Sequence, residues 1–221
     1  MEYLTKTDFD SSILSNIVHI TTISITFKTG TNLFIDEIKK VYPNHKKPFY
    51  NSTSIPIPID KNSTRTIHCK LFKNGSVQCA GFKTLQDINY AISYVIDKLS
   101  EEKEIKLVEK EIVVSDVKII LINSNFSFPF SIRRDAFFKL LLEDGIVCFF
   151  DSCKHSALQI HFLVDDKKKP IKIFIFQSGS VNVFGSKHHN HIFNAYNFLK
   201  VLVDKHIEAI KVVNLESRRN I

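Results

Sequence analysis

Two stretches of this sequence nearly repeat each other: FKNGSVQCAGFKT at residues 72–84 and FQSGSVNVFGSKH at residues 176–188. A helix-like stretch follows each of them. Self-similarity at a long fixed offset indicates two copies of one structural unit. The residues that recur at constant spacing are Phe72, Gly75, Ser76, Val77, Gly81 and Lys83 in the first copy and Phe176, Gly179, Ser180, Val181, Gly185 and Lys187 in the second.

The elements predicted around these stretches follow the same order in both halves of the chain. Each half has an apolar strand, an amphipathic helix, several short strands including the repeated hairpin, and a longer closing helix. The closing helices carry one apolar stripe each, so each covers one face of a sheet and leaves the other face open. We therefore predict an α+β fold with two repeats, at residues 1–111 (core about 13–100) and residues 112–221 (core about 116–206).

Composition narrows the class of protein. The chain has 221 residues, 44% hydrophobic content and a net charge of +7, which favours an anionic partner without proving one. We see neither an apolar signal core nor a run long enough to span a bilayer, so we expect an intracellular protein without membrane contact.

The sequence offers no catalytic set, no metal site and no cofactor-binding loop. The histidines of KHHNH (residues 187–191) do not share one helical face, and Cys148 and His155 lack an orienting group. We therefore predict that the protein is not an enzyme. Cys69 and Cys79 fall on predicted strands without a framework spacing, and we expect them to be buried free thiols.

The register of the hairpins decides which side chains share a face. A three-residue loop puts only aliphatic residues and cysteines on the inner face, whereas a two-residue loop mixes the two faces. We therefore predict the three-residue loop in both copies. The outer face then carries His68, Lys70, Phe72, Gln78 and Ala80 in the first hairpin and Lys172, Phe174, Phe176, Asn182 and Phe184 in the second. Such exposed aromatic side chains indicate an interface, or else a further layer such as the N-terminal segment covers them.

At these residues the sequence resembles the TATA-binding protein (TBP) family. The repeats LFKNGSVQCAGFK (residues 71–83) and IFQSGSVNVFGSK (residues 175–187) are similar to its hairpin pattern. SNIVHIT (residues 15–21) and FSFPFSI (residues 126–132) resemble its strand starts, and the resemblance spans roughly residues 13–206. It implies a saddle in which two pseudo-symmetric repeats form one curved antiparallel sheet with four helices on the convex face.

The resemblance also implies a site on the concave face, which binds the minor groove of duplex DNA and bends it with Phe wedges. Phe72 and Phe176 match the second wedge position of each repeat, and Phe49 matches the first wedge of repeat one. In repeat two the first wedge falls near His155, with Phe149 and Phe150 as candidates if the alignment shifts. Asn16 and Val18 match groove-floor residues, and their partners in repeat two are Ile119 and Leu121.

The hairpins depart from the family pattern at the groove floor. Lys70, Gln78 and Ala80 in repeat one, and Phe174, Asn182 and Phe184 in repeat two, stand where the family has Leu, Val and Thr. TATA specificity is therefore not implied. The DNA-binding residues that we predict are Asn16, Val18, Phe49, Lys70, Phe72, Gln78, Ala80, Lys83, Leu121, Phe174, Phe176, Asn182, Phe184 and Lys187, and Lys172 is a further candidate phosphate contact.

We therefore predict a divergent TBP-like transcription initiation factor, with double-stranded DNA as one partner. Initiation factors or RNA polymerase would bind its stirrup loops, such as DDKKK (residues 165–169), and its convex helices. The composition, with nineteen Phe, no Trp and abundant Ile, Lys and Asn, fits a large DNA virus, with the nucleus or a viral factory in the host cytoplasm as the place of action. The alternative is a saddle-shaped protein-interaction module that has lost DNA binding. An accessory domain of a nucleic-acid enzyme is disfavoured because no catalytic domain is present.

Overall fold

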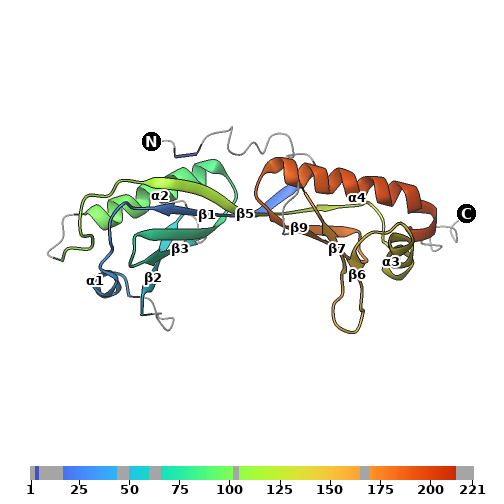
Figure 1. Cartoon of the computed structure of the whole chain (residues 1–221), viewed down its shortest axis with the longest axis horizontal. Coiled ribbons are helices and arrows are strands. Elements are labelled where there is room, and N and C mark those ends of the chain that lie inside the picture. Colours follow the sequence, from blue (N-terminus) through green and yellow to red (C-terminus); the bar gives the residue numbers. More distant parts are fainter. Residues whose placement is uncertain are drawn as a thin grey trace, which may run out of the picture. The chain divides into compact units, whose positions relative to one another are not determined.

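The computed structural model describes residues 3–4, 17–43, 50–59, 66–101, 105–164 and 170–212. The chain divides into two compact units, the first comprising Met1–Ser11 with Thr21–Ile122 and the second Ser12–Ile20 with Asn123–Ile221. The long strand β5 (Ser115–Ser127) runs from the first unit into the second. Both units are shown in Figure 1, coloured along the chain. No described helix is both long and apolar enough to cross a bilayer.

The first unit is a sheet with two helices. Its strands follow the order β2-β3-β4-β1-β5, and the pairs β2–β3, β3–β4 and β1–β4 are antiparallel. Helix α2 packs against the sheet, and the shorter α1 lies near β2 (Figure 1). The bounds are β1 His19–Lys28, α1 Ile35–Val41, β2 Ser52–Pro58, β3 Thr66–Phe72, β4 Ser76–Phe82 and α2 Leu85–Ser100.

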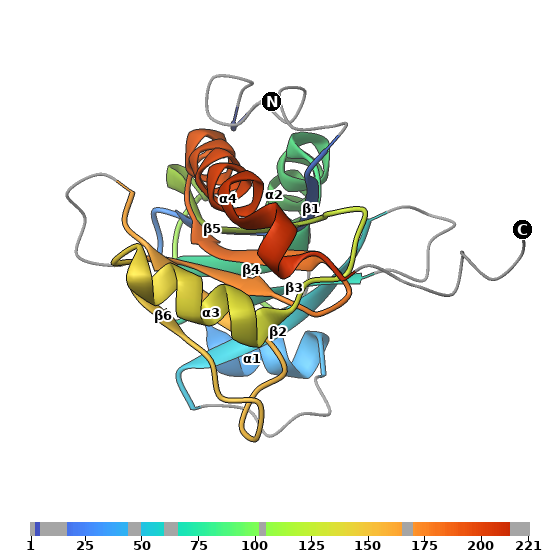
Figure 2. The ribbon, with the colours of Figure 1, turned by 90° about the vertical axis from the view of Figure 1, so that its right-hand side faces the viewer.

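The second unit repeats this plan. Its strands follow the order β5-β9-β8-β7-β6, with antiparallel pairs β8–β9, β7–β8 and β6–β7. Figure 2 looks at this unit end-on and shows α4 on one side of the strands and the loop after β6 on the other. The bounds are α3 Arg134–Glu143, β6 Cys148–Phe149, β7 Leu158–Phe162, β8 Ile171–Ile175, β9 Ser180–Ser186 and α4 His189–Ile210.

The closing helices form where the sequence predicts them. Thr84 is the N-cap of α2, and its side chain accepts a hydrogen bond of 3.1 Å from the Asp87 backbone N–H. One stripe of each helix is buried against its own sheet: Ile88, Ala91, Ile92, Val95 and Leu99 in α2, and Ile192, Ala195, Leu199, Leu202 and Val203 in α4. Each helix therefore covers one sheet face, as the apolar stripes predict.

Both hairpins have the predicted three-residue loop. Leu71 pairs with Val77 in the first hairpin and Ile175 with Val181 in the second. The loops close in the same way, because the N–H of Gly75 donates to the Phe72 carbonyl at 2.9 Å and the N–H of Gly179 donates to the Phe176 carbonyl at 3.0 Å. This register buries the expected inner face, with Ile67, Cys69, Leu71, Val77 and Cys79 in one hairpin and Ile171, Ile173, Ile175, Val181 and Val183 in the other.

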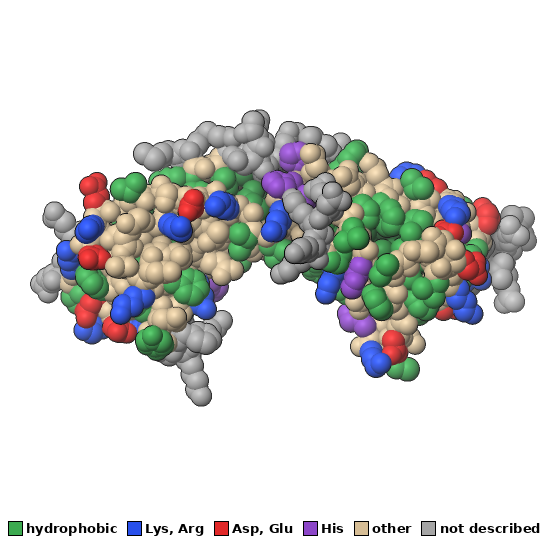
Figure 3. Space-filling view, viewed as in Figure 1, with side chains coloured by type: hydrophobic (Ala, Val, Ile, Leu, Met, Phe, Trp, Pro, Cys, Tyr) green, Lys and Arg blue, Asp and Glu red, His purple; other side chains and the backbone are tan. Residues whose placement is uncertain are grey.

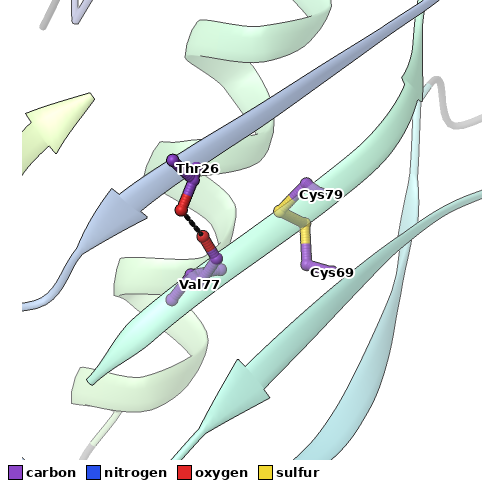
Figure 4. Close-up of a disulfide and its surroundings, with 4 residues drawn as sticks. All are labelled: Thr26, Cys69, Val77 and Cys79. Carbon is purple, nitrogen blue, oxygen red and sulfur yellow. Dashed lines mark hydrogen bonds between the residues drawn. A yellow bond between two sulfur atoms is a disulfide. The ribbon is translucent and has the colours of Figure 1, made fainter. Parts of the chain in front are cut away.

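The expectation of free thiols at Cys69 and Cys79 is wrong, because the two residues form a disulfide (Figure 4). They are directly opposite each other on β3 and β4, with their Cα atoms 4.2 Å apart on the inner face. A separation of ten residues in sequence does not reveal this pairing, which the register of the hairpin creates. On the neighbouring strand, the Thr26 hydroxyl donates to the Val77 carbonyl at 3.0 Å.

Candidate nucleic-acid interface

The outer face of the first hairpin is open to solvent among the described residues. His68, Gln78 and Ala80 are exposed, and Lys70 and Phe72 are half-buried, whereas every residue between them on the inner side is buried. Lys70 pairs across the strands with Gln78 and lies with its ammonium 5.0 Å from the centre of the Phe72 ring. The Lys70 cation thus lies over the Phe72 ring beside the turn, at the distance of a cation–π contact.

The outer face of the second hairpin has the same register and more aromatic content. Phe174 pairs with Asn182, and Lys172 pairs with Phe184. The rings of Phe174 and Phe184 meet edge to face with their centres 5.2 Å apart. Lys172 is exposed, and the other residues of this face are half-buried. The second face therefore combines one amide with a cluster of aromatic rings.

A further layer over these faces was the competing interpretation, with the N-terminal segment as the candidate. The described part of that segment lies elsewhere. The backbone N–H groups of Tyr3 and Leu4 both donate to the Asn89 side-chain oxygen, at 3.0 and 3.1 Å, and Asn89 belongs to helix α2. Leu4 is buried there. These contacts hold Tyr3 and Leu4 against a helix rather than over the aromatic strands.

The predicted wedge residues Phe72 and Phe176 occupy equivalent positions. Each precedes its three-residue turn directly, and each is half-buried. Glycine follows within both turns because the backbone there has positive φ, +78° at Gly75 and +87° at Gly179. The structure thus presents one partly exposed Phe at the same corner of each hairpin. Phe49, the first wedge position of repeat one, lies outside the described residues.

Three residues compete for the first wedge position of repeat two, and the structure separates them. The His155 ring lies 5.5 Å from the Phe174 ring, so it borders the outer face of the second hairpin. Phe149 is 53% exposed and lies 4.9 Å from the His161 ring. Phe150 instead packs against α3, with its ring centre 5.2 Å from the Arg134 guanidinium carbon. A hollow of about 320 Å³ on this loop is lined by Phe138, Cys148, Phe149, Phe150, Asp151, Lys154, His155 and Gln159.

The other predicted residues are more scattered. Lys83 and Lys187 are exposed directly after β4 and β9, ahead of the closing helices. Leu121 is half-buried on β5, whereas Val18 is only 3% exposed and offers little surface to a partner. Asn16 lies outside the described residues, as does the charged run at residues 165–169.

Sequence reasoning overlooked two amides on β5. Asn123 and Asn125 are half-buried and alternate with the buried residues Ile122, Ser124 and Phe126. Alternation in a strand places the two amides on the face opposite the buried one. The Asn123 side-chain oxygen is itself enclosed, without a hydrogen-bond partner among the described residues. The period-two pattern of this strand was the signal that would have identified them.

One further lysine beside the first hairpin is paired with a carboxylate. Lys28 on β1 lies 2.8 Å from the Asp116 carboxylate, and Lys118 lies 3.7 Å from it. The hydrogen bond from Lys28 and the charges of both lysines hold the pKa of Asp116 below its usual value. This ion pair offsets the charge of Lys28, which weakens Lys28 as a phosphate contact. The described residues contain no group of three metal-ligating side chains.

Comparisons with known proteins agree with this geometry. No protein-family model matches the chain. A TATA-box-binding protein-like protein of Acanthamoeba polyphaga mimivirus is 31% identical over 210 residues, which cover 85% of this chain. The chain spans only 56% of that relative.

The solved structure of Methanococcus jannaschii TBP matches with a TM-score of 0.65 at 18% identity, covering 86% of this chain and 99% of that one. The structural match shows the fold, and the viral relative supplies the similarity in sequence. The predicted fold class and the resemblance are both confirmed: the chain has the TBP fold, and its sequence is similar to that of a viral TBP-like protein.

Proposed function

We propose that the chain binds the minor groove of duplex DNA through the outer faces of its hairpins, bends the duplex and acts in transcription initiation. The observation that carries the proposal is that Phe72 and Phe176 occupy the same corner, directly before the turn, in their respective hairpins. Each is a partly exposed aromatic ring beside a tight turn. Flat apolar side chains at such corners replace base stacking when a base step opens, and the larger protein surface that a bent duplex covers offsets the cost of unstacking.

Lysines around these corners supply the affinity for the phosphate backbone of the DNA. Lys70 and Lys172 lie on the outer faces, and Lys83 and Lys187 follow at the ends of the same hairpins. Contacts of this type do not depend on sequence and weaken as salt concentration rises. Together with the net charge of +7, they favour a polyanion as the partner.

The first wedge position differs between the units under this proposal. In the second unit His155 beside Phe174 replaces a Phe, and the neighbouring Phe149 is the exposed aromatic residue of β6. An imidazole ring stacks on a base less extensively than a phenyl ring with its full apolar surface. The opening of the base step is therefore shallower at this corner than at Phe176.

Transcription initiation factors or RNA polymerase are the protein partners that go with this role, with the charged loops and the outer surfaces of the helices as their binding sites. The mimivirus relative is named for TATA-box binding, and similarity to it supports a viral or nuclear setting in which duplex DNA is transcribed. None of these steps requires a catalytic group or a cofactor.

The test is a titration of fluorescently labelled duplexes with the full chain, in which energy transfer between the duplex ends reports bending. The double variant Phe72→Ala and Phe176→Ala should lose bending, and its affinity should fall by about a hundredfold, because each stacked aromatic ring stabilises by about 1–3 kcal/mol. Phe193→Ala is the matched control, since Phe193 is 44% exposed on α4, away from the hairpins. Bending by the double variant equal to that of the wild type rejects the wedge role.

The alternative, a protein-interaction module, is favoured by one observation. The aromatic pair Phe174–Phe184 stands on the face where an apolar partner would also bind. Two results together would support this alternative: the purified chain binds no duplex at low salt, and it copurifies with a polypeptide that the variant Phe174→Ala no longer binds. Selection of bound duplexes from a random pool distinguishes the two functions and also reports base preference.

A further inference from the structure

We infer that this protein accepts guanine–cytosine pairs in the bound segment, because the side-chain amides of Gln78 and Asn182 bind the guanine 2-amino group. The inference rests on the proposed function and adds a base preference to it. Gln78 and Asn182 occupy the same place in the two hairpins, each paired with the second residue before the wedge: Lys70 for Gln78 and Phe174 for Asn182.

The chemistry of the minor groove gives these positions their meaning. An A·T pair presents only acceptors there, whereas a G·C pair adds one donor, the guanine amino group. A smooth apolar surface leaves that donor without a partner and so excludes guanine. A carboxamide has an oxygen that accepts from the amino group and an NH₂ that donates to the ring acceptors of either pair.

The amide of Gln78 is available for such a contact. It is exposed on β4, between Lys70 on β3 and Thr26 on β1, with which it pairs across the strands. The Thr26 hydroxyl donates to the Val77 carbonyl at 3.0 Å, so it is already engaged. Among the described residues, the Gln78 side chain has no hydrogen-bond partner. Both ends of this amide therefore face outward with their hydrogen-bonding capacity unused.

Asn182 is the equivalent group in the second unit. It is half-buried on β9, and its side chain likewise has no hydrogen-bond partner among the described residues. The Phe174 and Phe184 rings flank its hairpin face and reduce the access of water. A hydrogen bond to a base edge is worth more in such a partly desolvated place than on an open surface. Asn123 is not included, because its oxygen is enclosed.

The test uses matched duplexes that differ only in the minor-groove amino group. A bound sequence is first selected from a random pool, and each of its base pairs in turn is then made A·T, inosine–cytosine or G·C. Inosine–cytosine has the acceptors of the groove without the amino group, so its comparison with G·C isolates that one donor. We expect the affinity of the wild type for the G·C duplexes to be equal to or higher than its affinity for the inosine duplexes, with about threefold as the tolerance of the comparison.

Variants then assign the effect to the two amides. Gln78→Val and Asn182→Val each replace an amide by an apolar group suited to a strand, and each should weaken binding of G·C relative to inosine–cytosine by about tenfold at its own base pair. Binding of the A·T duplexes should change by less than about threefold. Asn197→Val is the control, because Asn197 is an exposed amide on α4.

The outcomes separate this inference from the proposed function. Wild-type binding that is tenfold weaker for G·C than for inosine–cytosine overturns the inference and leaves minor-groove binding intact. Failure to bind any of the three duplexes overturns both. If the variants do not fold, the wild type alone decides with a diaminopurine–thymine duplex, which adds the same amino group to an A·T pair. Equal affinity for that duplex and its A·T parent supports the amide contact, and a tenfold loss contradicts it.

Discussion

The hairpins β3–β4 and β8–β9 have one backbone plan and two different sets of side chains. On the inner face, the position of the Cys69–Cys79 disulfide in the first hairpin is held by the Ile173–Val183 pair in the second. On the outer face, Lys70, Gln78 and Ala80 correspond to Phe174, Asn182 and Phe184. The register therefore persists although side chains on both faces have changed, and what the two hairpins share is the glycine turn and the remaining aliphatic inner positions.

The same comparison predicts that the two units contribute differently to DNA binding. The first hairpin offers a cation and an amide on its outer face, and the second offers an aromatic cluster. Figure 3 shows a related contrast on the side of the molecule: Lys, Arg, Asp and Glu are scattered over the first unit, and hydrophobic side chains gather in the second, below α4. We expect the first unit to contribute more to the attraction of DNA phosphates and the second unit to contribute more to stacking on DNA bases.

The turns give the largest predicted effect. Gly75→Ala would place a Cβ atom 2.1 Å from the Thr31 carbonyl oxygen, and Gly179→Ala would place one 2.3 Å from that of Phe130. Both contacts are with backbone, which cannot move aside cheaply, and both residues have positive φ. Each variant should lose more than about 3 kcal/mol of unfolding free energy, measured by urea titration, or fail to fold.

Gly145→Ala is the matched control for this prediction. Gly145 also has a positive φ, +73°, but a Cβ atom there meets nothing within 4 Å. The variant should lose only about 1–2 kcal/mol, the conformational cost alone. Equal losses in all three variants would show that backbone conformation determines the loss of unfolding free energy. The contacts of the turns with the segments that follow β1 and β5 would then contribute nothing.

The fold was predictable from sequence because several independent patterns agreed. The repeated Gly positions, the aliphatic inner face and the apolar stripes of the closing helices each predicted the arrangement that is observed. The disulfide was not predictable, because a spacing of ten residues means nothing until the hairpin register places Cys69 opposite Cys79.

The candidate site was only partly predictable, for a different physical reason. The outer faces of the hairpins follow directly from the period-two alternation, so Phe72 and Phe176 could be placed from sequence. At the first wedge position of repeat two no Phe stands in register with the family pattern, so alignment alone left His155, Phe149 and Phe150 as alternatives. Only the packing of Phe150 against α3 removes that residue from the open face.

Exchange of the Cys69–Cys79 pair on the inner face tests whether the two hairpins are equivalent. The double variant Cys69→Ile and Cys79→Val gives the first hairpin the core pair of the second, and it should fold with the same register. Reduction of the wild type should remove about 2–3 kcal/mol, because a cross-link that closes a loop of this length restricts the unfolded chain by about that amount. The double variant should show no response to reductant. Its failure to fold would mean that the two hairpins are not interchangeable.

The outer faces give a smaller effect, visible as salt dependence. Lys70→Gln should reduce the slope of log affinity against log salt concentration by about 0.9 if Lys70 contacts one phosphate. Lys28→Gln is the control, since Lys28 is already paired with Asp116 at 2.8 Å. Its slope should change by less than half as much. An equal change for both lysines would contradict the expectation that the ion pair with Asp116 weakens Lys28 as a phosphate contact.

The smallest effect concerns how each short helix is attached to its closing helix. In the first unit the Tyr42 hydroxyl donates to the backbone carbonyl of Lys98, an acceptor without charge, at 3.3 Å. In the second unit the Asp144 carboxylate binds Lys205 at 2.6 Å and His206 at 2.7 Å. The hydrogen bond from Lys205, followed by that from His206, holds the pKa of Asp144 below its ordinary value of 3.8.

Because the folded pKa of Asp144 is lowered, its contribution to stability is present above pH 3.8 and is lost as the pH falls through the folded value. Asp144→Asn should therefore lower the melting temperature by about 2 °C at pH 7, with the difference from wild type shrinking as the pH falls below 3.8. Tyr42→Phe, which removes the link in the first unit, should give a difference that stays constant over the same range. A loss that does not depend on pH would mean that ionisation of Asp144 contributes nothing to the α3–α4 link.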